Sequence, residues 1–148
     1  MTFRSTKTFP PISCAFRQHR AQSHCRFLHG YALEFRIEFE AEELDENNWV
    51  VDFGSLKSLR DQIEEFFDHK TVVAEDDPED ELFNRAHSRN LLRLSWLPQV
   101  GCEAFARKVF DMATHWLIGQ GLAPRVWVAQ VECSEHKNNS ALFINPTR

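Results

Sequence analysis

The alternation of apolar and polar residues between Tyr31 and Glu40 is the feature that most restricts how this chain can fold. Two sets of alternate positions separate cleanly: Tyr31, Leu33, Phe35, Ile37 and Phe39 against Ala32, Glu34, Arg36, Glu38 and Glu40. Because successive side chains of a strand point to opposite faces, this period of two predicts a β-strand with one buried and one solvated face. Half-buried strands of this kind are typical of antiparallel sheets.

Weaker patterns predict further strands on both sides of this one. They cover residues 2–9, Ile12–Gln18, Trp49–Phe53, Leu91–Trp96, Arg125–Cys133 and Ser140–Ile144. The turn-forming run Asp45–Asn48 stands before Trp49–Phe53, which predicts that this segment forms a hairpin with the 31–40 strand. Residues 74–81 are mostly acidic, and their spacing misses the EF-hand pattern, so they predict a solvated loop. The sequence assigns no role to this loop.

Two segments have helical spacing. In the first, which follows Ser55 as an N-cap and stops near Asp68-His69, the apolar residues are Leu56, Leu59, Ile63, Phe66 and Phe67. The second runs from about Cys102 to Ile118 and is closed by Gly119 and Gly121. Strands and helices do not alternate strictly. The sequence therefore predicts one α+β domain over residues 1–148, with two helices packed on one face of an antiparallel sheet.

The charge and composition of the chain limit the kinds of molecule that it can bind. A formal net charge of −5, with no basic block beyond Arg17, Arg20 and Arg26, argues against nucleic acid and leaves a small anionic molecule as the better match. No apolar run approaches the roughly eighteen residues of a membrane span, and the first residues lack the apolar core of a signal peptide. The four cysteines are irregularly spaced, which predicts free thiols. We therefore expect a cytoplasmic protein without membrane or nucleic-acid partners.

The stretch from His19 to Tyr31 holds the candidate functional residues. It contains His19, His24, His29 and Cys25 within thirteen residues. Imidazole and thiolate bind borderline metals, and a thiolate is also a base and a nucleophile. Neither a C-x-x-C nor an H-E-x-x-H spacing is present, which disfavours a closed structural zinc site. The pattern predicts a metal site, a catalytic thiol or both, against the alternative of histidines scattered on a wet loop.

An ordered series of short motifs resembles a known family. The series is Cys25–Tyr31 (Cys-Arg-Phe-Leu-His-Gly-Tyr), Val50–Phe53 before a helix, Phe67–His69 at its end, Gly101–Glu103 before a second helix, and Val131-Glu132 in a late strand. Taken together over roughly residues 12–143, they resemble the 6-pyruvoyl-tetrahydropterin synthase and 6-carboxy-tetrahydropterin synthase family.

The resemblance implies a tunnelling fold that assembles through sheet edges into trimers and hexamers, with active sites between subunits. It implies a zinc ion held by three histidines, which binds the side chain of 7,8-dihydroneopterin triphosphate. It further implies that Cys25 moves side-chain protons with the help of Asp68 and His69, that Glu132 anchors the pterin, and that Glu103 lies near it. A thiolate flanked by His and Arg can ionise near neutral pH, which suits this role.

The sequence departs from the family at the expected zinc ligands. The family's His-Gly-His is His29-Gly30-Tyr31 here, and the counterpart of its Ala-Ala-His is Cys14-Ala15-Phe16. Three explanations remain open: a rearranged set of His29, His24 and His19, with Tyr31 as a weak oxygen ligand; loss of zinc or use of another divalent ion; or a non-catalytic paralogue that binds a pterin or a partner. We expect a lyase that makes 6-carboxy-tetrahydropterin on the queuosine route, with the pyruvoyl product or a pterin-binding module as alternatives.

Overall fold

The long strand β3 (His29–Ala41) is the centre of the fold, as its alternation predicts. The computed structural model describes residues 1–148, and within it Leu33, Phe35, Ile37 and Phe39 are completely buried. The other strands are β1 (Phe3–Thr8), β2 (Ile12–Phe16), β4 (Lys70–Ala74), β5 (Leu94–Leu97), β6 (Val126–His136) and β7 (Asn139–Ile144). The helices are α1 (Lys57–Phe67), α2 (Asp80–Ser88) and α3 (Cys102–Gly119), with short 3₁₀ turns at His24–Arg26 and Phe53–Leu56.

Every other strand is placed relative to β3, directly or through one neighbour or two. The sheet order is β5-β4-β2-β3-β6-β7, and β1 also pairs with β3. β2 and β1 share one edge of β3, with Ile12 opposite Leu33 and Thr8 opposite Arg36, and the other edge pairs with β6. The two adjacent prolines, Pro10 and Pro11, fall between β1 and β2, where no backbone N–H is needed.

The expected all-antiparallel sheet is corrected to a mixed one, because β4 runs parallel to both β2 and β5. β4 was not predicted from the sequence. Residues Thr71–Ala74 are all buried, so they show no alternation of apolar and polar side chains. A continuous buried run of this kind is typical of parallel strands, and periodicity does not identify it.

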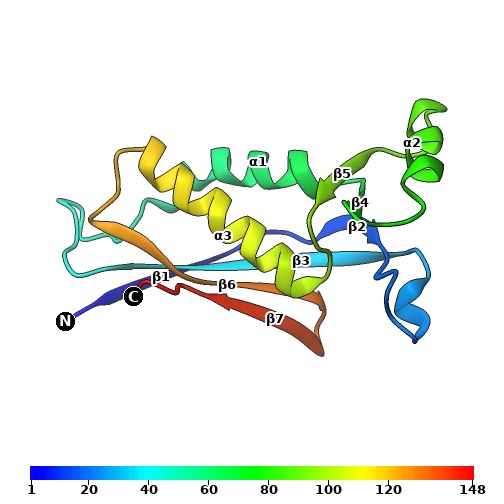
Figure 1. Ribbon diagram of the computed structural model, residues 1–148. Helices are drawn as coiled ribbons and strands as arrows, with labels where there is room; N and C mark the ends of the chain where they lie inside the picture. Colours follow the sequence, from blue (N-terminus) through cyan, green and yellow to red (C-terminus); the bar gives the residue numbers. More distant parts are fainter.

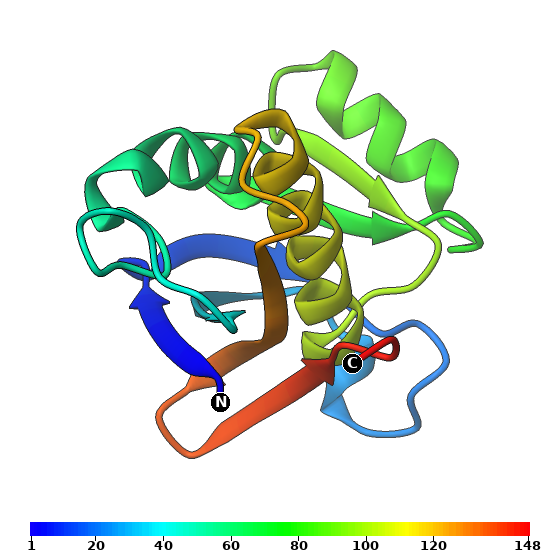
Figure 2. The same cartoon turned by 90° about the vertical axis from the view of Figure 1, so that its left-hand side faces the viewer.

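Three helices are present, where two were expected. Helices α1 and α3 cover one face of the sheet, and α2 lies at the end of the molecule near β4 and β5 (Figures 1 and 2). α2 buries only Phe83, which explains why the sequence gave no clear apolar stripe for it. No helix combines the length and the apolar character that crossing a bilayer requires.

The acidic segment 74–81 is mostly exposed, as predicted, apart from Ala74 at the end of β4 and Asp77. Asp77 is 3% exposed and accepts two hydrogen bonds from Arg17, at 2.9 Å from Nε and 2.6 Å from Nη2. The segment is therefore a turn that is fastened to the end of β2 and leads into α2.

The predicted hairpin strand Trp49–Phe53 does not form. β6 already occupies the edge of β3, so the segment has no strand to pair with. Its carbonyl groups are satisfied by Arg125, which donates to the backbone oxygens of Glu43, Trp49 and Val50. Ser55 is not the cap of α1 either. Asp52 caps the preceding 3₁₀ turn by accepting from the Gly54 amide at 2.9 Å, and α1 continues from that turn.

Aromatic side chains connect the core to one end of the sheet. Phe67 of α1 contacts Phe35 and Phe105, with ring centroids 5.0 and 5.4 Å apart. Phe105 meets Phe16 at 4.9 Å, and Phe16 stacks on Tyr31 at 4.7 Å. The chain of rings therefore ends where β2 stops and β3 begins, close to the residues that the sequence singles out.

Candidate functional site

The loop between β2 and β3 carries Cys25 and is closed at its base. The Gln18 amide donates to the Cys25 carbonyl at 2.9 Å, and the Ser23 hydroxyl accepts from the Cys25 amide at 3.3 Å. These bonds hold Cys25 in a short 3₁₀ turn, where it is partly buried. A partly exposed thiol on a fastened loop is suitably placed to exchange protons with a bound molecule.

The three predicted metal ligands are not gathered around one point. His19 has its Nε2 3.1 Å from Asp76 Oδ1, His29 has its Nδ1 2.8 Å from the Phe27 carbonyl, and His24 is exposed in the 3₁₀ turn. No group of three His, Cys, Asp or Glu side chains in the chain is arranged to hold a metal ion. Within one chain, His19, His24 and His29 therefore do not fit a zinc ion.

The Asp68-His69 pair occupies the junction of α1 and β4. His69 Nδ1 lies 3.0 Å from Asp68 Oδ1, and the imidazole is largely exposed. The backbone of His69 has φ 57°, a left-handed conformation that is uncommon for residues other than Gly, although Asn, Asp and His adopt it more often than the rest. Its amide donates to the Ser13 carbonyl at 2.7 Å, which helps to hold this conformation. A carboxylate thus fixes one nitrogen of an exposed imidazole, as a proton relay requires.

Cys25 and His69 are at opposite ends of β2. His69 is bonded to Ser13 near the start of β2, whereas the loop with Cys25 leaves after Phe16 at its end. A strand of this length spans about 13 Å, at the usual rise of about 3.3 Å per residue. The structure therefore does not bring the predicted catalytic thiol and the predicted relay together within one chain.

Glu103 and Glu135 face a common cavity. It has a volume of about 140 Å³ and is lined by Phe16, Gln18, Gly101, Cys102, Glu103, Glu135 and residues 139–141. Glu103 lies in the first turn of α3, and Glu135 lies near the end of β6. Burial, together with the negative charge of Glu135, raises the pKa of Tyr31. Two carboxylates at one small cavity form an acceptor site for a ligand with several N–H donors.

Glu132 lies elsewhere. It projects from β6 on the face opposite to the buried Cys133, and its Oε2 is 3.9 Å from Arg36 Nη1. The sequence predicted Glu132 as the pterin-binding residue and did not predict that Glu135 lines the cavity. The signal was available in the period of two: Val131 and Cys133 are buried, so residue 135 continues their face to the edge of the core.

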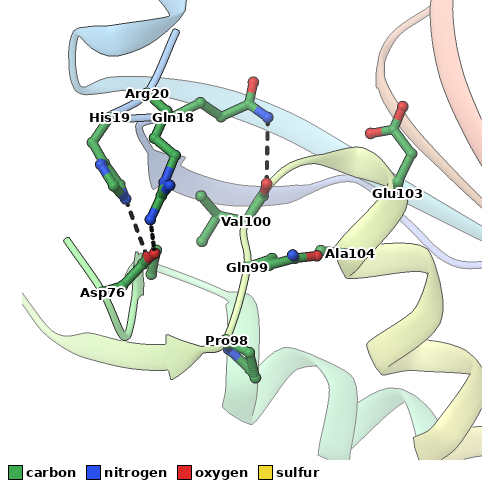
Figure 3. Close-up of a pocket in the computed structure, with 10 residues that line it drawn as sticks. Gln18, His19, Arg20, Asp76, Pro98, Gln99, Val100, Glu103 and Ala104 are labelled. Carbon is green, nitrogen blue, oxygen red and sulfur yellow. Dashed lines mark hydrogen bonds and ion pairs between the residues drawn. The ribbon is translucent and has the colours of Figure 1, made fainter.

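Gln18 separates this cavity from a larger one. The second cavity has a volume of about 530 Å³ and includes Gln18, His19, Arg20, Asp76, Gln99 and Glu103 (Figure 3). Figure 3 shows the side-chain amide of Gln18, whose Nε2 donates to the Val100 carbonyl at 3.3 Å. It also shows that His19 and Arg20 both point towards Asp76. Hydrogen bonds from His19 and Arg20 lower the pKa of Asp76. The basic groups at this cavity are therefore already paired.

Gly101 is required at the wall between the two cavities. Its φ is 124°, and a Cβ added there would come within 2.7 Å of Gln18 Nε2. Any larger residue would strain the backbone and displace Gln18. The N-terminus of α3, with Cys102 and Glu103, depends on this close approach.

The four thiols are all free and differ in their surroundings. Burial raises the pKa of Cys14 to about 12, so its thiol stays protonated. The pKa of Cys133 is raised by a hydrogen bond with Cys102 and by burial, and the same bond lowers the pKa of Cys102. Cys14 and Cys133 thus behave as core residues, whereas Cys25 and Cys102 are partly accessible near the cavity end of the sheet.

Comparison with known proteins identifies the family of the chain. The family model for 6-pyruvoyl tetrahydropterin synthase matches residues 6–145. A 6-carboxy-5,6,7,8-tetrahydropterin synthase of Rickettsia bellii is 37% identical over 59 residues, which is 39% of this chain. The matched part spans 43% of that relative's length.

Solved structures share the whole fold. An uncharacterized protein of Wolinella succinogenes superimposes with a TM-score of 0.83 at 20% identity, covering 98% of this chain and 99% of the other. The 6-pyruvoyltetrahydropterin synthase of Plasmodium vivax gives 0.72 at 13% identity, covering 98% of both chains. That of Caenorhabditis elegans gives 0.62 at 16% identity, covering 98% of this chain and 95% of the other. At these identities the likeness concerns the fold.

Proposed function

Because the chain belongs to the 6-pyruvoyl tetrahydropterin synthase family, we propose that it binds a pterin between Glu103 and Glu135 and acts on 7,8-dihydroneopterin triphosphate. The observation that carries this proposal is the cavity that both carboxylates border. An amino-pyrimidine edge offers several N–H donors, and ionised carboxylates are acceptors only, so the two are complementary. Glu135 already accepts one hydrogen bond, from Asn139 Nδ2 at 3.0 Å, and an ionised carboxylate has further acceptor positions for a ligand.

In the proposed reaction, triphosphate leaves and the hydroxylated side chain rearranges. This requires removal of a proton from a carbon next to a developing carbonyl group. Cys25 as the thiolate takes this proton, and His69, oriented by Asp68, moves a second one. The product we propose is 6-carboxy-tetrahydropterin, on a route to deazaguanines such as queuosine, because the partly matching Rickettsia relative bears that name. Reaching it also takes up one water molecule and releases the two outer side-chain carbons as acetaldehyde. The pyruvoyl product is the alternative.

We further propose that the active site is shared between copies of the chain. Cys25 and His69 lie at opposite ends of β2, so a second copy must supply one of them if both act on one molecule. Trimers or hexamers joined through sheet edges would allow this, since β7 and β1 each have an edge without a partner strand in the chain.

A second candidate is a pterin-binding protein without catalysis. It is favoured by one observation: Phe16 and Tyr31 stand where the family resemblance expects imidazoles. Under this proposal Glu103 and Glu135 still bind the pterin, and Cys25 has no turnover to support.

The experiment that separates the two candidates is a turnover assay with purified protein and 7,8-dihydroneopterin triphosphate. Triphosphate release and the new pterin are measured in the wild type and in Cys25→Ala. The enzyme proposal requires release by the wild type and its loss in Cys25→Ala, with pterin binding retained. Equal inactivity of both proteins, with binding intact and with zinc added, would leave the binding-protein proposal.

The shared site is tested by mixing two variants. Cys25→Ala and His69→Ala are each expected to be inactive. After dissociation and reassembly of the mixture, part of the activity returns if each site takes Cys25 from one copy and His69 from another. No return of activity, with mixed oligomers present by native mass spectrometry, would contradict sharing. A mass spectrum with monomers alone would contradict it as well.

A further inference from the structure

The β2–β3 pairing gathers three aromatic side chains at the cavity end of the sheet. In the antiparallel register, Phe16 lies opposite His29 and Cys14 lies opposite Tyr31. Tyr31 is two residues from His29 on the same face of β3, and their ring centroids are 4.5 Å apart. The three positions at which the family resemblance expects imidazoles are therefore adjacent in space, as Phe16, His29 and Tyr31.

Phe16 is firmly part of the core. It is 3% exposed and stacks on Tyr31 with an angle of 22° between the ring planes, while Phe105 meets it edge-on at 85°. Stacked and edge-on aromatic pairs of this kind stabilise the ring beyond the contribution of its burial. A phenyl ring has no lone pair to offer a metal ion, and both of its aromatic contacts hold it in the position where an imidazole would be needed.

His29 and Tyr31 do not replace the metal ligand that is missing at Phe16. His29 Nδ1 is bonded to the Phe27 carbonyl, which leaves Nε2 as its single free nitrogen. Tyr31 offers a phenol in place of an imidazole, and its ring is held in the stack on Phe16, with the ring centroids 4.7 Å apart. One imidazole nitrogen remains, whereas zinc in proteins takes three or four protein ligands.

We propose that this end of the site holds no resident zinc, and that the Phe16–Tyr31 stack occupies the space that three imidazoles would share. The bound ligand then meets an aromatic wall with one imidazole and one neutral phenol. This inference rests on the proposed function for the identity of the ligand, but its test does not.

The test is the zinc content of the purified full chain after equilibration with excess zinc and removal of unbound metal. The wild type is expected to retain far less than one zinc ion per chain. The double variant Phe16→His/Tyr31→His, which restores three imidazoles next to His29, is expected to retain about one. After loading with Co²⁺, the double variant should also show the visible absorption of a tetrahedral site, and the wild type should not.

About one zinc ion per wild-type chain, lost in His29→Ala, would overturn the proposal. This criterion depends on the wild type alone, so a double variant that fails to fold does not remove it. Pterin binding is measured on the same preparations by fluorescence. Wild type that binds zinc and pterin refutes the inference but not the proposed function, and wild type that binds neither refutes the proposed function but not the inference.

Discussion

The two glutamates of β6 show how one strand presents the same side chain to two different environments. Glu132 faces the side of the sheet that the helices leave open, near Arg36. Glu135 faces the other side, next to the first turn of α3, where it borders a cavity together with Glu103. Both carboxylates have a basic neighbour, Arg36 at 3.9 Å from Glu132 and His136 at 3.8 Å from Glu135, but of the two only Glu135 lines the cavity with Glu103. What distinguishes them is the face of the strand, which a list of acidic residues does not contain.

The largest effect on stability is expected at Asp77, a carboxylate that is buried and paired. It shows how much a carboxylate can contribute, against which Glu132 and Glu135 can be compared. Asp77→Ala removes the partner of Arg17, and we expect the free energy of unfolding to fall by about 3 kcal/mol, the range for breaking a buried pair. Chemical denaturation measures it. A loss below about 1 kcal/mol would mean that the pair behaves as a surface ion pair.

The same pair predicts a pH dependence. Burial pushes the pKa of Asp77 upward, but hydrogen bonds from Arg17 and from the Glu79 amide outweigh burial and lower it. A lowered pKa gives stability that is present above the unfolded value of about 3.9 and is lost as the pH falls towards the folded value. Below about pH 4, the wild type should therefore lose stability more steeply than Asp77→Asn. Parallel curves would contradict this.

The next effect concerns the pterin itself. Glu135→Gln keeps the shape of the side chain but removes the charge and replaces an acceptor with a donor. We expect pterin affinity to fall by about 10- to 100-fold, since a hydrogen bond to a charged group contributes about 1.5–3 kcal/mol. Fluorescence titration measures the change. Equal losses in Glu135→Gln and Glu132→Gln would remove the distinction between the two faces of β6.

A smaller effect is expected at Gly101. Gly101→Ala forces a side chain into a backbone with φ 124° and pushes Gln18 away, which shifts the N-terminus of α3 and Glu103 with it. We expect pterin affinity to fall by about fivefold and stability to fall by about 1–3 kcal/mol, the usual cost of a strained residue. Gly119→Ala is the matched control, because nothing lies within 4 Å of a Cβ added there.

The smallest effect is expected at the open face. Arg36→Met removes a cation that lies 3.9 Å from Glu132 and 3.9 Å from Glu38, and both contacts are longer than a hydrogen bond. Stability should change by less than about 1 kcal/mol, because exposed ion pairs contribute little. Pterin affinity should stay the same within about twofold, and a larger change would show that the open face takes part in binding.

Regular periodicity was the part of the fold that could be predicted. The alternation in β3, the apolar stripe of α1 and the extent of α3 were all predicted from residues 31–40, 56–67 and 102–118, and the structure has them there. β4 escaped prediction because it is buried on both faces, and α2 because it buries only Phe83. Trp49–Phe53 has strand-like residues, but its place beside β3 is taken by β6.

The site was predicted less completely, since neighbours in sequence are not always neighbours in space. His19, His24 and His29 lie within eleven residues, yet His19 contacts Asp76, His29 contacts the Phe27 carbonyl, and His24 is exposed. Asp68 and His69 form the expected pair, because adjacent residues at a helix end need no long-range contact. Glu135 was not predicted, because an acidic residue within an apolar run singles out Glu132 but does not show which face of the strand its side chain is on.

The pairing of β1 and β2, one after the other, with the same edge of β3 affects how precisely the strands are aligned. Three strands take their alignment from β3, and each depends on which of its side chains face the core. A slip of β3 by one position would turn Leu33, Phe35 and Ile37 outward in a single step and would also separate Tyr31 from Phe16. A shifted register of β3 is therefore strongly unfavourable. The positions of the site residues on β2 and β3 are fixed by the packing of the core rather than by the few hydrogen bonds of the site.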